Sequence, residues 1–586
     1  MSKENTLIDE TPIYHPFRLP ITFVKKERLH TLTKNVMEDL ELNTSINKNI
    51  FPSDKDSRTF GNLTREEWSK QITTDVSFLK DTQNILIDIT KQTNDKDKNK
   101  QDASQFFAIW DDVHDKHFLE KYYYMDWPQL TYLNKSSKFL QCITVANVLS
   151  PLLSLCIPLF IIIIPFIILK IKGINIDMNK YIQVLKETAG NHFIGKSILN
   201  MESLSWDKLI YLIITFVVYV FQIYQNTTTC FKYYKNVKKI NENLLYVKNY
   251  ISSTINKMES FVLKHKSKRS YYLFCQEVEK HSNQLKPFLQ ELSIISEFQH
   301  TIKKSSEVGY MLKCYHELMN NDLYSTSIRF SMGFEGYLEN MMALSNHIKS
   351  GKMSLATFNL SKETSIQKQF YPLTKEKITN NVTMKNNIII TGPNASGKTT
   401  LIKTTTVNII VSQQIGCGFY TSCSLHPYHY IHSYINIPDT SERDSLFQAE
   451  SRRCKDILDI IDTSLKHYRH FCIFDELYSG TNPIEANKAG YAFLSYLTKY
   501  ENIDFILTTH YIDMCERIKK ENKSIINDKK NKKKIINYKM NVNEKDDQLE
   551  YTYKMMKGIS YIQGAIHVFK SMDYPKEILN LVRCSL

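Results

Sequence analysis

The chain has 586 residues, more than one hydrophobic core usually holds, so several domains are expected. Lys and Arg number 75 against 61 Asp and Glu, and the net charge of +14 favours anionic partners such as nucleic acid or lipid headgroups. A composition rich in Lys, Asn and Ile would give the same surplus without such a ligand. The eleven cysteines form no CxxC pair, which argues against a disulfide framework and a zinc ribbon.

Residues 1–130 predict a helical amino-terminal region. Candidate helices lie at about 65–91 and 103–124, and a charged low-complexity segment at 94–101 separates them. The first 17 residues carry charges where a signal peptide needs an apolar stretch, so no secretory signal is expected.

Two apolar segments predict a membrane hairpin within residues 131–235. Residues 139–169 contain 31 positions without a charge, and residues 209–231 add 23 more. A helix needs about 20 apolar residues to cross the hydrocarbon core of a bilayer. Buried core helices are the alternative. Prolines at 151, 158 and 165 leave open whether the first segment is a kinked span or a re-entrant hairpin.

Residues 236–350 predict a second helical region, resembling a core or lever. Between 243 and 332 only Pro287 and Gly309 act as helix breakers. Apolar residues recur from Leu244 to Val262 in steps of three and four, which is typical of one buried helix face. A helix bundle and a short coiled-coil arm both fit this pattern.

From about residue 351 to 586, short apolar runs alternate with helical stretches, which predicts an α/β domain with a mainly parallel sheet. A buried strand at 387–390 leads into the segment TGPNASGKTT, and a helix is expected at 401–414. This order of strand, GxxxxGK[ST] and helix is the context of a P-loop. Glycines let the backbone wrap around phosphates, and the helix N-terminus supplies positive potential.

The pattern assigns roles to residues of this loop. Lys398 is expected to meet the β- and γ-phosphates of ATP, and Thr399 to hold Mg²⁺. The predicted nucleotide-binding residues are Gly392, Pro393, Asn394, Ala395, Ser396, Gly397, Lys398, Thr399 and Thr400.

Two further strands are expected to end beside the loop. The strand at 471–474 is followed by Asp475 and Glu476, which would act through Mg²⁺ and polarise the attacking water, respectively. A solvated acidic turn is the alternative. The strand at 504–507 leads to His510, a candidate sensor of the γ-phosphate, although a lone histidine can also be a core residue.

These motifs together resemble the ATPase domain of the MutS family. TGPNASGKTT, FDELYSGTNPIEA (474–486) and TTHY (508–511) follow one another as GPNxxGKS/T, DExxxGT and THY/F do in that family. Two more stretches, SLFQAE (445–450) and residues 553–579, resemble its segment ending in S-T-F-x-x-E and its closing dimerisation region. The resemblance is strong over about residues 350–586 and loose before them.

The resemblance implies ATP and Mg²⁺ as ligands and a head-to-tail homodimer through the ATPase domain. In such a dimer Ser445 would reach the γ-phosphate bound to the partner subunit, and Asn394 would contact it within its own subunit. Lys398, Glu476 and His510 would be the catalytic residues, and Thr399 and Asp475 the magnesium ligands. DNA is the partner that the family implies.

Several features depart from repair MutS. Ala395 and Ser396 replace its usual Met-Gly, and nothing in residues 1–130 resembles a mismatch-binding domain. Phe118-Leu119-Glu120 matches its Phe-x-Glu reader, but such a match is expected by chance among 30 phenylalanines. The two predicted spans are also foreign to repair MutS, and instead resemble divergent membrane-anchored MutS-like ATPases.

A cluster of possible metal ligands lies inside the same domain. Its members are His426, His429, His432, Cys417 and Cys423. Their spacing could suit zinc, yet the family binds no metal there, so no zinc is expected.

The sequence therefore predicts a P-loop ATPase domain of the ABC/MutS type, preceded by a mostly helical region with two transmembrane segments. We expect an integral membrane protein whose termini both face the ATP-containing, cytosolic side, because two spans return the chain to its starting side. Its ATP cycle would control clamping on DNA. The alternatives are membrane remodelling or transport on a non-DNA partner, and a scaffold in which ATP only sets assembly.

Overall fold

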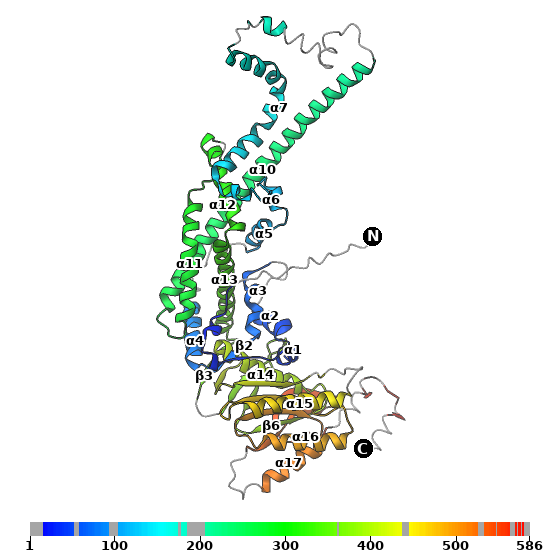
Figure 1. Cartoon of the computed structure of the whole chain (residues 1–586). Coiled ribbons are helices and arrows are strands. Elements are labelled where there is room, and N and C mark those ends of the chain that lie inside the picture. The colour runs from blue at the N-terminus through cyan, green and yellow to red at the C-terminus, as the bar shows by residue number, and fades with distance from the viewer. Residues whose placement is uncertain are drawn as a thin grey trace. The chain divides into compact units, whose positions relative to one another are not determined.

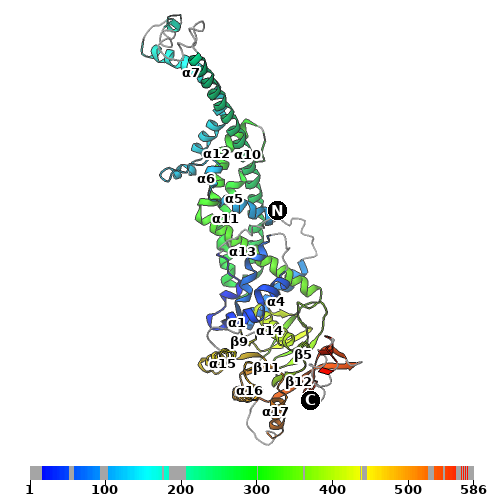
Figure 2. The same cartoon turned by 90° about the vertical axis from the view of Figure 1, so that its right-hand side faces the viewer.

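The computed structural model describes residues 16–51, 58–92, 103–173, 206–299, 301–359, 363–435, 445–524, 533–545 and 548–562, with isolated residues elsewhere. Two compact units make up the chain, and both are discontinuous in sequence (Figures 1 and 2). Unit 1 comprises Met1–Ala103, Met258–His281 and Arg329–Leu586, whereas unit 2 comprises Ser104–Lys257 and Ser282–Ile328. The amino-terminal residues thus belong to the same unit as the α/β segment.

Short elements and one long helix form the amino-terminal part of unit 1. Their bounds are η1 Pro20–Phe23, η2 Lys26–Arg28, β1 Leu29–Thr31, α1 Lys34–Asp39, η3 Leu42–Ile46, α2 Asn47–Ile50, α3 Phe60–Arg65, η4 Glu66–Ser69, β2 Gln71–Thr73 and α4 Val76–Gln92. The helix predicted to start at 65 was placed too early, because β2 pairs with β1 and Asp75 caps α4. The Asp75 carboxylate accepts from the amides of Ser77 and Phe78 at 3.0 and 3.2 Å.

Helices dominate unit 2, as the sequence predicts. They are α5 Ala103–Val113, α6 Phe118–Lys121, η5 Thr131–Lys135, α7 Ser137–Ile171 and α12 Ile302–Asn320, with parts of α10 Trp206–His265, α11 Tyr272–Ser293 and α13 Asp322–Lys349. The helix expected at 103–124 is interrupted, because the Asp115 carboxylate accepts from the amide of His117 at 2.8 Å and starts a new turn there. The segment at 94–101 lies outside the described residues.

One candidate membrane span, not two, is present among the described residues. It is Ser137–Cys156 of α7, which has a mean hydropathy of 1.7. Only 17% of an apolar 18-residue stretch of this helix is buried. The second predicted segment forms the first part of α10, and several of its side chains lie outside the described residues. The first segment is one continuous helix through all three prolines.

The α/β part of unit 1 is built on a six-stranded sheet of order β13-β12-β6-β11-β10-β9. Its strands are β6 Asn387–Thr391, β9 Tyr430–Tyr434, β10 His470–Asp475, β11 Ile503–Thr509, β12 Ile535–Lys545 and β13 Gln548–Lys557. All neighbours are parallel except β13, which runs antiparallel to β12. The predicted strands at 387–390, 471–474 and 504–507 are confirmed as β6, β10 and β11.

A second, five-stranded sheet of order β5-β4-β8-β3-β7 mixes strand directions. Its strands are β3 Ser354–Phe358, β4 Ser365–Gln369, β5 Asn380–Thr383, β7 Cys417–Gly418 and β8 Ser422–Leu425. The α/β part therefore contains mixed as well as parallel pairing, which the sequence did not indicate.

Alternate residues of the central strands pack into two hydrophobic cores, one on each face of the sheet. Ile389, Phe474 and Leu507 pack with α15 Leu446–Thr463, α16 Pro483–Leu497 and α17 Ile512–Ser524 on one face. Ile390 and Ile506 pack on the other face with α14 Lys398–Ile415 and the amino-terminal elements. This alternation is expected of a sheet covered on both faces.

Helix α14 is buried along almost its whole length because the amino-terminal part covers it. Gln413 donates to the carbonyl of Thr73 at 3.3 Å, and Gln414 to that of Gln71 at 3.0 Å. Gln83 in turn donates to the carbonyl of Gly416, just past the helix, at 2.6 Å. The amino-terminal residues thus hold the helix that follows the predicted phosphate loop.

Candidate functional site

The loop between β6 and α14 has the local geometry that a phosphate loop requires. Gly397 lies in the left-handed region at φ 89°, and a Cβ there would approach the Tyr553 ring to 3.0 Å. A Cβ on Gly392 would approach Ser396 Oγ to 2.8 Å. Since α14 begins at Lys398, its unpaired first amides lie at this loop. The glycines therefore permit a tight turn directly before a helix N-terminus.

Lys398 is buried and folded back on this loop. Its Nζ donates to the carbonyls of Gly392 and Pro393 at 3.0 and 3.3 Å, and lies 3.0 Å from His510 Nε2. Burial lowers the pKa of Lys398 from its ordinary value of 10.5, although the nearby Glu476 and Asp475 favour the charged form. The ammonium group is held by weak neutral acceptors that an anion could replace.

Thr399, in the first turn of α14, meets Asp475 at the carboxyl end of β10. Thr399 Oγ1 donates to one Asp475 oxygen at 2.7 Å, and Thr508 Oγ1 donates to the other. A hydroxyl and a carboxylate at this distance are oxygen ligands that suit Mg²⁺. The structure thus places together the two predicted magnesium ligands.

Glu476 and His510 meet beside Lys398. Glu476 Oε1 lies 3.0 Å from His510 Nε2, and the two side chains are 44% and 40% exposed. This hydrogen bond is the main reason why the pKa of Glu476 lies below its ordinary value of 4.5. Glu476 also has a left-handed backbone, at φ 53°. Its carboxylate is therefore held ionised at the strand end.

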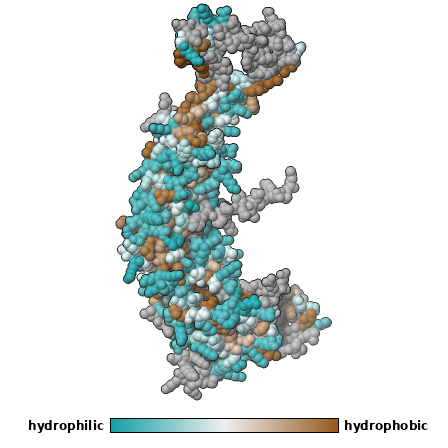
Figure 3. All heavy atoms as spheres, in the orientation of Figure 1, coloured by the Kyte–Doolittle hydropathy of each residue, from teal (hydrophilic) through white to brown (hydrophobic). Residues whose placement is uncertain are grey.

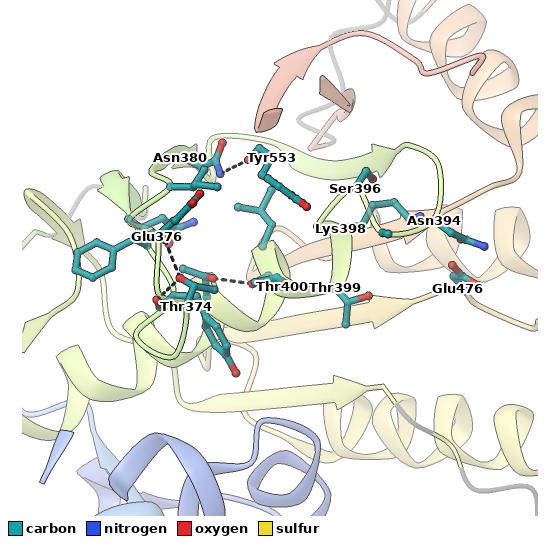
Figure 4. A pocket seen from close by; sticks show the side chains of 18 residues that line it. Thr374, Glu376, Asn380, Asn394, Ser396, Lys398, Thr399, Thr400, Glu476 and Tyr553 are labelled. Atoms are coloured by element: carbon teal, nitrogen blue, oxygen red, sulfur yellow. Dashed lines mark hydrogen bonds between the residues drawn. The ribbon is translucent and has the colours of Figure 1, made fainter. Parts of the chain in front are cut away.

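A cavity of about 490 Å³ opens along this loop (Figure 4). Asn394 to Thr400 and Glu476 line it, as do residues that the motifs do not contain. The latter are Gln369, Phe370, Tyr371, Thr374, Glu376, Ile378, Asn380, Leu401, Thr404 and Tyr553. Cavities of this size commonly hold small molecules. Phe370 and Tyr371 directly follow β4 and Tyr553 lies on β13, and no sequence motif links these aromatic residues, so the sequence did not reveal this wall.

Hairpin β12–β13 holds Tyr553 beside the loop. Asn380 Nδ2 donates to the carbonyl of Tyr553 at 2.9 Å, and Asn380 Oδ1 accepts from the amide of Met555 at 2.8 Å. Phe370 and Tyr371 border the same cavity, and Lys377 Nζ lies 4.4 Å from the Phe370 ring centroid. The cavity therefore joins a phosphate-type loop to an aromatic wall.

A nucleotide with Mg²⁺ fits these residues. Among the described residues, Ser396 Oγ is buried without a hydrogen-bond partner beside the loop, and Lys398 Nζ contacts two carbonyls and a histidine. Anionic phosphates would suit this donor set, and the aromatic wall would suit a base.

Ser445 does not line the cavity of its own chain. It caps α15, accepting from the amide of Gln448 at 3.3 Å. Glu450 on the same helix is 2% exposed and accepts from the amides of Ser479 and Gly480 at 3.0 and 3.1 Å. The loop after Glu476 is therefore fastened to the helix that carries Ser445.

The candidate zinc ligands have other partners. His432 Nε2 lies 3.0 Å from His470 Nδ1, His426 Nδ1 lies 2.8 Å from the Asn359 carbonyl, and His429 Nδ1 accepts from the Arg469 amide at 3.1 Å. Cys417 and Cys423 are buried. Within the described ranges, no three His, Cys, Asp or Glu residues are grouped to hold a metal ion.

Phe118, of the chance match to a mismatch reader, is 1% exposed. Its ring packs against Tyr122, Tyr124 and Tyr315 at centroid distances of 5.3 to 5.5 Å. It is a core residue of unit 2.

The strand order, the loop and the converging side chains make comparison with known proteins informative. Residues 388–585 match the family described as MutS domain V. The matched region includes every predicted site residue, whereas Phe370, Tyr371 and Asn380 of the cavity precede it. The chain thus contains a MutS domain V.

Curated relatives resemble the same part of the chain. The DNA mismatch repair protein MutS of Bacteroides fragilis (strain YCH46) is 30% identical over 223 residues, which are 36% of this chain and 24% of that protein. The endonuclease MutS2 of Lactococcus lactis subsp. lactis (strain IL1403) is 23% identical over 286 residues, 48% of this chain and 34% of that protein. The chain therefore spans a quarter to a third of the length of these relatives.

Proposed function

We propose that unit 1 binds and hydrolyses ATP as a MutS-type ATPase. The observation that carries this proposal is the convergence of three strand ends on one loop. Lys398 after β6, Asp475 and Glu476 at the end of β10 and His510 after β11 lie within hydrogen-bond reach of one another or of Thr399. Three independent strands would rarely bring these groups together without a common ligand.

Different residues of the cavity would bind different parts of ATP. The loop amides and Lys398 would hold the phosphates, and Thr399 and Asp475 would hold Mg²⁺, which supplies charge neutralisation. Glu476 would orient a water, and its ionised state suits an acceptor for the water's proton. Phe370, Tyr371 and Tyr553 offer stacking surfaces for the base.

Two chains would act together in this proposal. Ser445 lies outside its own cavity but at the N-terminus of α15, where it would suit an anion bound to a second subunit. Glu450 fastens α15 to the loop after Glu476. A contact across the dimer that moves α15 would therefore also move the backbone next to the catalytic carboxylate. A head-to-tail homodimer would supply this arrangement.

We further propose that the ATP cycle controls clamping on DNA while α7 and α10 anchor the protein in a membrane. The mismatch repair relatives support DNA as the partner, and the exposed apolar surface of α7 supports the anchor. Both termini would lie on the ATP-containing side. Membrane remodelling or transport on a non-DNA partner is the second candidate, favoured by that apolar surface and by the confinement of the family match to domain V.

The full chain in detergent, with and without duplex DNA, tests the ATPase proposal. Lys398→Ala is expected to lose nucleotide binding, whereas Glu476→Gln should still bind nucleotide and turn over at least about 100-fold more slowly. Lys403→Ala is the matched control on α14, because Lys403 pairs with Glu41 at 3.2 Å and does not line the cavity. Equal turnover in all four proteins would refute the site.

Two measurements test DNA as the partner and the membrane anchor. Clamping on DNA predicts duplex binding that weakens steeply with salt, since released counterions drive such binding. Absence of binding at low salt would instead favour the second candidate. Resistance to alkaline carbonate extraction from membranes tests the anchor, and complete release into the soluble fraction would refute it.

A further inference from the structure

Helices α7 and α10 of unit 2 pack as an antiparallel hairpin through polar contacts on their facing sides. Thr144 Oγ1 lies 2.6 Å from Tyr233 OH, and Asn226 Nδ2 donates to Ser154 Oγ. Tyr219 OH donates to the carbonyl of Ser154 at 3.2 Å. These polar groups are thus satisfied inside the hairpin, as they must be in a bilayer.

The outer surface of the same hairpin is apolar (Figure 3). Large apolar side chains that are more than 40% exposed cover both helices. They include Val145, Val148, Leu149, Leu152, Leu153, Leu155, Ile163, Ile164, Ile167 and Ile168 of α7, and Ile210, Ile213, Ile214, Phe216, Val217, Val218, Val220 and Phe221 of α10. A core helix of a soluble protein would bury such residues, so hydrocarbon is the environment that fits them.

Two glutamines interrupt this outer surface. Gln222 and Gln225 are exposed on α10, next to Phe221 and Tyr224, which are 56% and 66% exposed. Neither carboxamide has a hydrogen bond to any residue that the structure describes. Both lie within the charge-free segment 209–231, and Gln222 is close to its middle. Each side chain offers two N–H donors and one acceptor oxygen.

The glutamines lie on a flank of α10. At 100° per residue, Gln222 lies about 40° and Gln225 about 100° around the helix from the mean direction of Tyr219, Asn226 and Tyr233. Val218, Gln222, Gln225 and Thr229 follow one another in steps of four, three and four, the spacing of a helix–helix seam. α7 therefore leaves this stripe open to a neighbour.

We propose that Gln222 and Gln225 join α10 to α10 of a second copy of this chain within the bilayer. This inference rests on the proposed membrane anchor. A carboxamide both donates and accepts, so an identical carboxamide related by two-fold symmetry is its complement. Hydrocarbon offers no other partner, and polar side chains in spans commonly associate helices in this way. The second copy is also what the proposed ATPase dimer supplies.

Disulfide trapping of the full chain in lipid vesicles without nucleotide tests the contact. Val218→Cys serves as the reporter, and the unsubstituted chain gives the background from its own cysteines, of which Cys142, Cys156 and Cys230 are the ones that are not buried among the described residues. Gln222→Leu with Gln225→Leu is expected to lower reporter cross-linking roughly fivefold. Val217→Leu with Val220→Leu, on the opposite flank, is the matched control and should leave cross-linking unchanged.

Carbonate extraction and ATP turnover of each variant separate the possible failures. Undiminished cross-linking in the double glutamine variant, with every protein membrane-inserted, would overturn the contact alone. A control pair that lowers cross-linking as much as the glutamine pair would overturn the contact as well. Release of the unsubstituted chain by carbonate would overturn both the anchor and the contact, while leaving the ATPase proposal in place.

Discussion

The nucleotide-type site of unit 1 and the apolar hairpin of unit 2 specify their geometry by different means. In the site, single residues at the start of α14 and at the ends of β10 and β11 meet within about 3 Å, so each depends on the register of a central sheet. In the hairpin, many interchangeable apolar residues cover the surface and a few polar contacts fix the packing. A single substitution in the site should therefore have a far larger effect than a single substitution in the hairpin.

Among the substitutions that compare the two regions, the largest effect is expected at Gly397. Gly397→Ala would force a Cβ to 3.0 Å from the Tyr553 ring at φ 89°, and the left-handed conformation alone costs about 1–2 kcal/mol. Nucleotide affinity, measured by fluorescence titration, should fall at least about thirtyfold. Gly351→Ala has a similar φ of 68° with nothing within 4 Å, so it controls for backbone strain. Equal affinity in the two variants would contradict the role of this close contact.

Much of this site could be predicted from the sequence because each of its motifs is local. The pattern at 391–400 contains its own glycines and lysine, and the strands before Asp475 and His510 are uninterrupted apolar runs. The aromatic wall could not be predicted, because Phe370 and Tyr553 are 183 positions apart and converge only through the pairing of β12 with β13 and the Asn380 bridge.

The amino-terminal region was the harder part to predict. Residues 16–51 and 58–92 join unit 1 through buried apolar side chains and through contacts such as that from Gln414 to the Gln71 carbonyl, and no local sequence pattern predicts such contacts. The partner of this region, helix α14, also gave no sequence signal of the contact. It is buried nearly all round, and its polar and apolar residues do not separate into two faces, so periodicity could not reveal what covers it.

A smaller effect is expected at Glu450, which tests whether the loop after Glu476 must be fastened to α15. Glu450→Ala leaves the amides of Ser479 and Gly480 without their acceptor, which should cost about 1–3 kcal/mol of unfolding free energy. ATP turnover should fall about tenfold, with affinity little changed. Glu485→Ala, which removes an exposed contact to Thr481, is the control. Unchanged turnover would mean that the loop holds its position alone.

The aromatic wall should contribute less than the loop. Tyr553→Ala is expected to weaken nucleotide binding about tenfold through loss of stacking, whereas Tyr553→Phe should retain binding, because its ring remains. Isothermal titration calorimetry measures both. Equal weakening in the two variants would assign the effect to the hydroxyl group and not to stacking.

A change in pH tests the pair of Glu476 and His510. The hydrogen bond from His510 depresses the pKa of Glu476, so the pair contributes stability above about pH 4.5, and this is lost as pH falls through the lower, folded pKa. His510→Ala should raise that pKa and move the acid limb of the pH–turnover profile to higher pH. An acid limb that does not move would show that another group titrates there.

A substitution inside the hairpin should have the smallest effect on ATP turnover. Asn226→Leu removes the contact to Ser154 between α7 and α10, and such contacts in membranes average about 0.6 kcal/mol. ATP turnover at 25 °C should stay within about twofold, and the thermal midpoint in detergent should fall slightly. Combining it with Ser154→Ala should add little, because one contact is removed in both. A loss of turnover as large as that expected of Glu476→Gln would mean that the hairpin packing directly sets the geometry of the proposed nucleotide site.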